Sequence, residues 1–376
     1  MRRYVPFMLF SLAIGCGEDP ATPAGPETPA ASVGATAAHY TFLTIADNRR
    51  DNFSRGSFGC PAINQVGQVA FHGERENGTD GIYRGVGTGI TVIAENGARF
   101  SFIGISPSIN DLGAVSFAAN LKTGGSGIFR GRGGAITTIT ESNSGPFEFF
   151  GFDTSVNDAG NVAFKAEQDD FDEGMFFGSG GAITTVYLAS TSQFAGSDVG
   201  PAINDLGQIA FLETLDNFDQ GLFLWNGSTF IPVAVAGGTS EIGSFFRAPS
   251  LNDRGVVGFH AFLVSGAEAV FKGSGGQLTL VADTDGPISS FDFGGPSINN
   301  AGVVAFAATL DTGEQGIFTG PDVVNNRVIG TGDNLKGSQV SSLVFCREGL
   351  NREGQLAFAV QLVDGRSLVI RATPIP

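Results

Sequence analysis

The sequence predicts an all-β fold, a single seven-bladed β-propeller with four antiparallel strands in each blade. One sequence unit is repeated seven times along the chain, and each copy divides into four short segments of strand-forming residues. The chain has 376 residues with 42% hydrophobic residues and 56 glycines, which supply both a large core and many tight turns. A four-stranded unit repeated every 40 to 50 residues is typical of propellers rather than of other repeat folds.

The repeat is marked by an asparagine, a glycine three positions later and a phenylalanine seven positions later. Successive asparagines are 46 to 52 residues apart, and only the last interval is long enough to contain an insertion. The asparagines are Asn64, Asn110, Asn157, Asn204, Asn252, Asn299 and Asn351. We expect each to stabilise a turn between two strands by bonding the backbone two residues on, so the motif is interpreted as structural.

The second unit shows the expected strands, which span residues 101–109, 114–120, 127–131 and 135–140. The phenylalanine of the motif falls on the second strand, where it can pack between neighbouring blades. The last unit ends after its third strand. We therefore expect residues 41–46 to supply its fourth strand, which would close the ring and cover an exposed sheet edge.

The N-terminal residues indicate export. Residues 1–16 combine a basic start with a short apolar run that ends in small residues before Cys16. This segment resembles a bacterial lipoprotein signal, in which Cys16 would be the lipid attachment site, and ordinary secretory cleavage is the alternative. Residues 17–39 are rich in Pro, Ala and Thr and are expected to form a disordered tether, which leaves residues 40–376 for the propeller. The expected location is the outer membrane, periplasm or exterior.

The seven motifs resemble those of exported bacterial proteins with tandem NxxGxxAF repeats, a family that uses varied surface anchors. The unit is also similar to the TolB-type propeller repeat, over about residues 41 to 372. The resemblance implies a propeller at the cell envelope and assigns no activity to any residue.

Composition and motifs exclude several functions. The net charge of −16 with only 21 Lys and Arg argues against nucleic-acid binding and leaves a lipid anchor as the only expected membrane contact. His72 and His260 occupy the same repeat position in non-adjacent units and are expected to be partly exposed strand residues. No catalytic triad or nucleophile motif is evident, and no cofactor is expected.

The acidic turns between the second and third strands are the strongest candidates for a ligand face. Units three and four contribute Glu167, Asp169, Asp170, Asp172, Glu173, Asp216 and Asp219. A solvated rim that aids solubility is the simpler interpretation, and a weak site for a divalent cation or a basic ligand is the alternative.

Cys60 and Cys346 precede the asparagines of units one and seven by four and five residues, and these units are neighbours only if the ring closes. Strand parity allows both side chains to point into the shared interface or both away from it. An oxidising compartment favours a disulfide that locks the ring, against two buried thiols.

Two functions therefore stay open. The first is a non-catalytic binding or scaffolding module, a monomer that uses one propeller face to bind an envelope protein, a peptide or a glycan. The second is an envelope hydrolase or lyase that acts on a glycan through carboxylates at the channel mouth.

Overall fold

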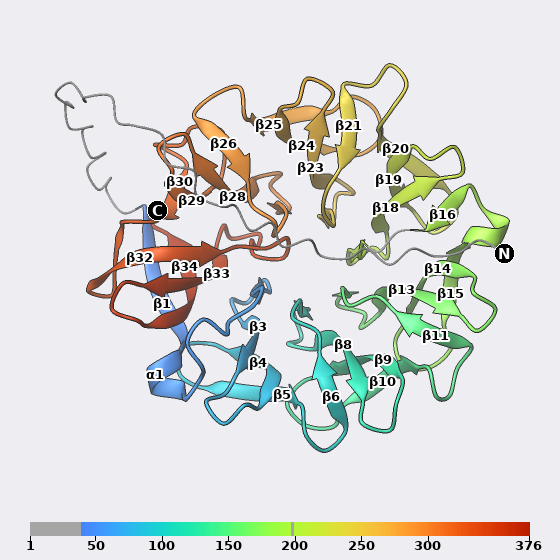
Figure 1. Ribbon diagram of the computed structural model, residues 1–376, viewed down its shortest axis with the longest axis horizontal. Coiled ribbons are helices and arrows are strands. Elements are labelled where there is room, and N and C mark those ends of the chain that lie inside the picture. Colours follow the sequence, from blue (N-terminus) through green and yellow to red (C-terminus); the bar gives the residue numbers. More distant parts are fainter. Residues whose placement is uncertain (1–38, 197–198) are drawn as a thin grey trace, which may run out of the picture. The chain divides into compact units, whose positions relative to one another are not determined.

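Seven blades surround a central channel in the computed structural model of the protein, which describes residues 39–196 and 199–376 (Figure 1). Neighbouring strands within each blade are antiparallel. The predicted fold is confirmed. No helix among the described residues is long and apolar enough to cross a membrane.

The strands follow the chain blade by blade. Blade one contains β2 (Ala62–Ile63), β3 (Val69–Glu74), β4 (Asp80–Gly85) and β5 (Ile90–Glu95). Blade two contains β6 (Phe100–Ile103), β7 (Ser108–Ile109), β8 (Val115–Leu121), β9 (Ser126–Gly131) and β10 (Thr137–Glu141). Blade three contains β11 (Phe147–Phe150), β12 (Ser155–Val156), β13 (Val162–Gln168), β14 (Glu173–Gly178) and β15 (Thr184–Leu188), followed by the 3-10 turn η1 (Ala189–Thr191).

Blades four to six repeat this arrangement. Blade four contains β16 (Phe194–Gly196), β17 (Ala202–Ile203), β18 (Ile209–Leu215), β19 (Gln220–Trp225) and β20 (Phe230–Val235). Blade five contains β21 (Ile242–Phe245), β22 (Ser250–Leu251), β23 (Val257–Leu263), β24 (Glu268–Gly273) and β25 (Thr279–Asp283). Blade six contains β26 (Ile288–Phe291), β27 (Ser297–Ile298), β28 (Val304–Leu310), β29 (Gln315–Phe318) and β30 (Arg327–Gly330).

Blade seven is composite, as the sequence predicts. Its members are β31 (Asn334–Leu335), β32 (Ser338–Val344), β33 (Leu356–Leu362), β34 (Ser367–Pro374) and β1 (Tyr40–Asp47). The N-terminal β1 lies antiparallel to β34, with Thr41 opposite Thr373, so the two ends of the propeller chain share one sheet (Figure 1). A short helix, α1 (Asn48–Asp51), then leads into blade one.

The first strand of each blade differs from its predicted form. In blade two, residues 101–109 were expected to be continuous, but β6 and β7 are separate segments that both pair with β8. Gly104 still donates its N–H to the Ala118 carbonyl of β8, and residues 105–107 then bulge out of the ladder, so the inner edge of the blade carries both strand and loop side chains. This matters for function because these bulges line the channel.

The core lies between the blades. The motif phenylalanines on the second strands are 2% exposed or less in all seven blades. In one cluster Phe117 and Phe129 of blade two pack on Ala70 and Ile82 of blade one. Burial of a phenylalanine stabilises the fold by on the order of 2 kcal/mol, so each blade is held mainly by its neighbours.

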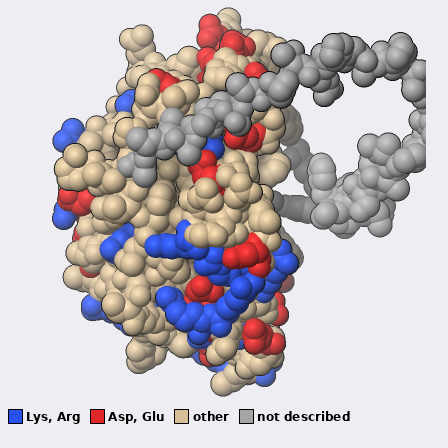
Figure 2. Space-filling view, turned by 90° about the vertical axis from the view of Figure 1, so that its left-hand side faces the viewer, with Lys and Arg blue, Asp and Glu red and all other residues tan. Residues whose placement is uncertain are grey.

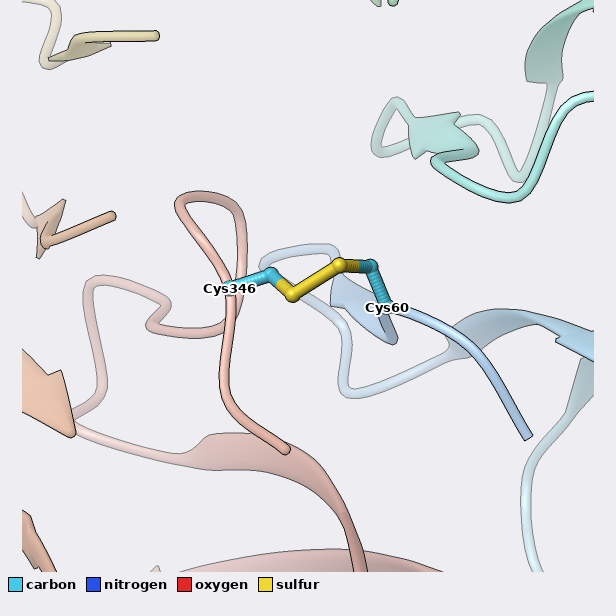
Figure 3. Close-up of a disulfide and its surroundings, with 2 residues drawn as sticks. All are labelled: Cys60 and Cys346. Atoms are coloured by element: carbon cyan, nitrogen blue, oxygen red, sulfur yellow. A yellow bond between two sulfur atoms is a disulfide. The ribbon is translucent and has the colours of Figure 1, made fainter. Parts of the chain in front are cut away.

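A disulfide crosses the closure of the ring. Cys60 and Cys346 are joined between blades one and seven, with Cα atoms 5.6 Å apart (Figure 3). Neither cysteine lies within a strand, because Cys60 comes just before β2 and Cys346 just after β32. The strand parity considered above therefore does not apply, and the irregular inner segments bring the two side chains together.

Candidate functional site

The seven motif asparagines form a closed ring of hydrogen bonds around the channel. Each side chain donates from Nδ2 to the backbone carbonyl of the asparagine in the next blade, at 2.9 to 3.2 Å. Each Oδ1 also accepts the backbone N–H four residues on. The predicted bond to the backbone two residues on is present only at Asn252, Asn299 and Asn351. The turn is instead held by the bond to the fourth residue, and the same side chain joins one blade to the next. We call the side of the propeller that carries these turns the asparagine face.

A second ring of side chains follows the first. Asp111, Asp158, Asp205 and Asp253 each accept the backbone N–H of the preceding blade's equivalent residue, at 2.7 to 3.1 Å. Burial, helped by the charges of neighbouring ring carboxylates and opposed by the hydrogen bond from the Asp158 backbone, raises the pKa of Asp205 to about 6. Burial raises the pKa of Asp111 in the same way. This ring gives the channel an acidic end.

Arg347 and Glu348 cross the channel from the connection between β32 and β33. The Arg347 guanidinium is buried and donates to the carbonyls of Thr154, Pro201 and Pro249, which belong to blades three, four and five. The Glu348 carboxylate accepts a hydrogen bond from Ser155 in blade three at 3.1 Å. Burial raises the pKa of Glu348, while the charge of Arg347 and the serine hydrogen bonds oppose the rise.

These two residues divide the channel into two cavities. The cavity on the asparagine face has a volume of about 130 Å³ and is lined by the motif turns together with Arg347 and Glu348. The other cavity, of about 280 Å³, is lined by the same two residues and by bulge residues such as Ile105, Asp153 and Phe293. It opens on the side where the second and third strands of each blade are joined, which we call the loop face.

The sequence reasoning missed this pair, although a signal was present. Six repeats have proline or threonine three residues before the asparagine, and the seventh has Glu348. A charged residue at a repeat position that is otherwise uncharged indicates that this unit does something different.

Aromatic side chains form two clusters beside the bulges of the first strands, and Phe293 and Arg247 of the second cluster line the cavity of the loop face. Phe102, Phe149 and Phe152 are between 41% and 51% exposed, and their rings contact one another at 5.5 and 6.4 Å across blades two and three. On blades five and six, Phe246 and Phe293 lie 5.3 Å apart, and Arg247 stacks on both rings. We call these six residues the aromatic rim, and clustered exposed aromatic groups of this kind are typical of interaction surfaces.

Two carboxylates come nearest to the pair that a glycan hydrolase or lyase would need. Asp153 and Glu348 both line the cavity of the loop face, and the charge of Asp153 contributes to the raised pKa of Glu348. A glycoside hydrolase or lyase needs such a pair free to face its substrate. Glu348 instead accepts the Ser155 hydrogen bond and lies beside Arg347, so its carboxylate is part of the closure of the channel.

The expectation that His72 and His260 are partly exposed is wrong. They are 8% and 2% exposed, because the second strand is covered on both sides by adjacent blades. His72 pairs with Asp80, and His260 lies 3.1 Å from Glu268. Burial lowers the pKa of His260, and Glu268 opposes this effect.

A buried charged group occupies the interface of blades three and four. Lys165 and the Tyr187 hydroxyl both donate to the Glu213 carboxylate, which is fully buried. Burial raises the pKa of Glu213, and the nearby Lys165 lowers it. Both partners come from the neighbouring blade, so the group cross-links the two blades.

The predicted acidic residues lie around two separate turns of the loop face. Asp169, Asp170 and Asp172 occupy the turn from β13 to β14, which Glu167 and Glu173 flank, and Asp216 and Asp219 occupy the turn from β18 to β19. Burial and the like charges of Glu173 and Glu148 raise the pKa of Glu167. The Asp172 carboxylate accepts hydrogen bonds from the backbone and hydroxyl of Ser190.

The part of the chain that the structure describes contains no group of three His, Cys, Asp or Glu side chains arranged to hold a metal ion. The divalent-cation site at the acidic turns stays a prediction. Cys16, the proposed lipid attachment site, lies outside the described residues, as do the signal segment and nearly all of the tether.

A β-propeller with a sealed channel and an aromatic rim is the class of protein that this geometry defines. Residues 31–146 and 141–368 match DUF7453, described as a family of unknown function. The chain belongs to this family.

Solved structures share the fold at low sequence identity. An oligogalacturonate lyase in complex with manganese has a TM-score of 0.53 at 11% identity, with 90% of this chain and 99% of that chain covered. The β-propeller domain of the Trilobed protease from Pyrococcus furiosus has a TM-score of 0.51 at 11% identity, covering 85% and 96%.

A TolB from Acinetobacter baumannii is similar at 15% identity with a TM-score of 0.39, and the match covers 58% of this chain. This chain spans about half of the length of that TolB, 51%. No curated protein matches the sequence.

Proposed function

We propose that the protein is a non-catalytic binding module of the cell envelope, which uses its loop face to hold an envelope protein, a peptide or a glycan. The observation that carries this proposal is the aromatic rim, whose six residues come from four blades and include Arg247 and Phe293, which line the cavity of about 280 Å³. Aromatic faces stack on sugars and on apolar or cationic side chains, and their exposure is otherwise unfavourable.

The state of the channel supports binding over catalysis. Arg347 and Glu348 are engaged with backbone carbonyls and a serine hydroxyl, so the most buried ionisable groups of the channel hold blades together. We further propose that the chain is exported and anchored through Cys16, that residues 17–39 tether a monomeric propeller, and that its repeats place it among the tandem NxxGxxAF proteins.

A paired comparison on immobilised ligands tests the function. Glycan and peptide arrays are probed with the wild-type protein, with Phe149→Ser plus Phe152→Ser, and with Leu206→Ser. Leu206 is the matched control because it is 72% exposed and follows a motif asparagine on the opposite face. We expect a ligand class that binds the wild type and the control and is lost in the double variant. Equal binding by all three proteins, or turnover of a glycan by the wild type, would contradict the proposal.

A further inference from the structure

The turns between the second and third strands follow one design in all seven blades. The residue at the same place in each turn donates its N–H to the carbonyl three residues earlier and has a positive φ. In five blades this residue is a glycine, which adopts positive φ without penalty: Gly78, Gly124, Gly266, Gly313 and Gly365. In blades three and four it is Phe171, with φ 67°, and Phe218, with φ 69°.

Both phenylalanines are presented to solvent. Phe171 is 75% exposed and Phe218 is 82% exposed, and within the described residues neither ring contacts another aromatic ring. A phenylalanine in this conformation is unfavourable twice, first through its backbone and then through its exposed ring. Blades three and four, which carry these two phenylalanines, are adjacent in the ring. The two aromatic side chains therefore lie at equivalent places on one part of the loop face.

The same part of the chain accounts for nearly all of the protein's net negative charge. Residues 133–246 contain fifteen Asp and Glu but a single Lys and no Arg, which is a net charge of −14 within a total of −16. That lysine, Lys165, is 7% exposed, so the described surface of this segment offers almost no positive charge. Asp169, Asp170 and Asp216 are exposed carboxylates in the same turns as the two rings.

The opposite side of the ring has a contrasting surface. Figure 2 shows Lys and Arg side chains gathered on the side of the propeller formed by blade seven and α1. Contacts there bring together Arg49, Arg55, Lys336 and Arg366 around the turn at Gly365. Charge is therefore segregated, and a cationic partner is drawn to blades three and four rather than to the loop face as a whole.

We propose that the turns at Phe171 and Phe218 dock an extended, Arg- or Lys-bearing peptide segment of a partner protein. Each phenyl ring receives a cationic side chain on its face, and the flanking carboxylates pair with the same or neighbouring cations. A segment is required because the two rings belong to different blades. This inference rests on the proposed function and names the partner class for one part of the loop face.

The repeat itself supplies the sharpest variant. Phe171→Gly plus Phe218→Gly restores the residue found in the other five blades, so it removes both rings while relieving the backbone. Val264→Gly is the matched control, since Val264 is 71% exposed in the corresponding turn of blade five. Asp169→Asn, Asp170→Asn and Asp216→Asn together test the charges.

Binding is measured by fluorescence anisotropy with a labelled decapeptide of alternating Arg and Gly, in chelator-containing buffer at low and physiological salt. A peptide with Asp in place of Arg is the negative probe. We expect the wild type and Val264→Gly to bind the Arg peptide, and the double glycine variant to bind at least tenfold more weakly while its Tm is unchanged or higher. The triple Asn variant should lose most of the salt dependence.

Three outcomes would overturn the proposal: no binding of the Arg peptide to the wild type, equal binding by the double glycine variant, or salt-sensitive self-association that the same variant abolishes. The last would assign these turns to a second copy of the chain. Failure here can be separated from failure of the proposed function. Ligand binding lost only in Phe149→Ser plus Phe152→Ser would retain the binding module and reject the peptide site, whereas no ligand in either experiment rejects both.

Discussion

The side chain of Asn351 in blade seven donates a hydrogen bond of 3.0 Å to the backbone carbonyl of Asn64 in blade one. This bond completes the asparagine ring across the junction where the chain's two ends meet. The bond and the sheet shared by β1 and β34 both close the ring at this junction. The bond is buried, since Asn351 is 0% exposed.

Asn351→Ala should lower the free energy of unfolding by roughly 3 kcal/mol. The change leaves the backbone N–H of Gln355 without its partner, which costs about 1–3 kcal/mol, and it removes one of the two hydrogen bonds that the Asn64 carbonyl accepts, the other coming from the N–H of Gly67. Urea unfolding followed by circular dichroism measures the effect. Asn334→Ala, an exposed asparagine of β31, is the control, and equal stability of the two variants would show that the ring contributes little.

Disulfide formation between Cys60 and Cys346 should be complete in the exported protein. Thiol counting on the unfolded, unreduced chain is expected to find neither cysteine free. The cysteines are 286 residues apart, so the chain-entropy account gives about 6 kcal/mol of stabilisation, less any strain. Reduction should therefore lower the unfolding midpoint of the wild type and leave that of Cys60→Ala plus Cys346→Ala unchanged. Two free thiols in the native protein would contradict the bond.

Asp205→Asn should stabilise the protein near neutral pH. Because burial raises the pKa of Asp205 from 3.8 to about 6, the folded protein keeps a proton that the unfolded chain has already released between these pH values. The free energy of unfolding of the wild type should thus fall as pH rises from about 4 to 6. The amide keeps the hydrogen bond, as Asn300 does at the equivalent place in blade six.

The measurement for Asp205→Asn is urea unfolding at pH 4.5 and at pH 7. The gain in stability should be larger at pH 7 than at pH 4.5. Asp311→Asn, at an exposed turn of blade six, serves as the control. A gain that is the same at both pH values would show that the charge of Asp205 is not responsible.

Calcium should bind weakly at the acidic turn of blade three. Calorimetry is expected to give a Kd on the order of a millimolar for the wild type, in the range of extracellular calcium modules, and a loss of heat in Asp169→Asn plus Asp170→Asn. If the wild type gives no heat, these carboxylates serve solubility and steering alone.

The sequence was sufficient for the propeller because its signals are local and repeated. The spacing of Asn110, Gly113 and Phe117 places a turn and a buried strand in one short segment, and seven copies in one register leave few alternative folds. The closing strand was predictable for the same reason, since residues 41–46 match the fourth strand of other units.

The site was predicted less well because it depends on contacts across the ring. That Asn64 reaches the next blade, or that Arg347 reaches three distant ones, is set by the diameter of the channel, which no spacing along the chain contains. The burial of His260 likewise follows from the blade that covers it. Phe171 and Phe218 differ, since aligning the seven turns by sequence already shows phenylalanine where five units have glycine.

Arg347 should make unfolding of the seven blades more cooperative than is usual for a repeat protein. In most repeat arrays each unit contacts only its neighbours, and an array can fray one unit at a time from an end. Here one guanidinium in the last blade is bonded to blades three, four and five. Detaching blade seven therefore disturbs the far side of the ring as well as its two neighbours. The seven units should therefore unfold in a single cooperative transition, because contacts at the centre of the channel link blades that are not neighbours.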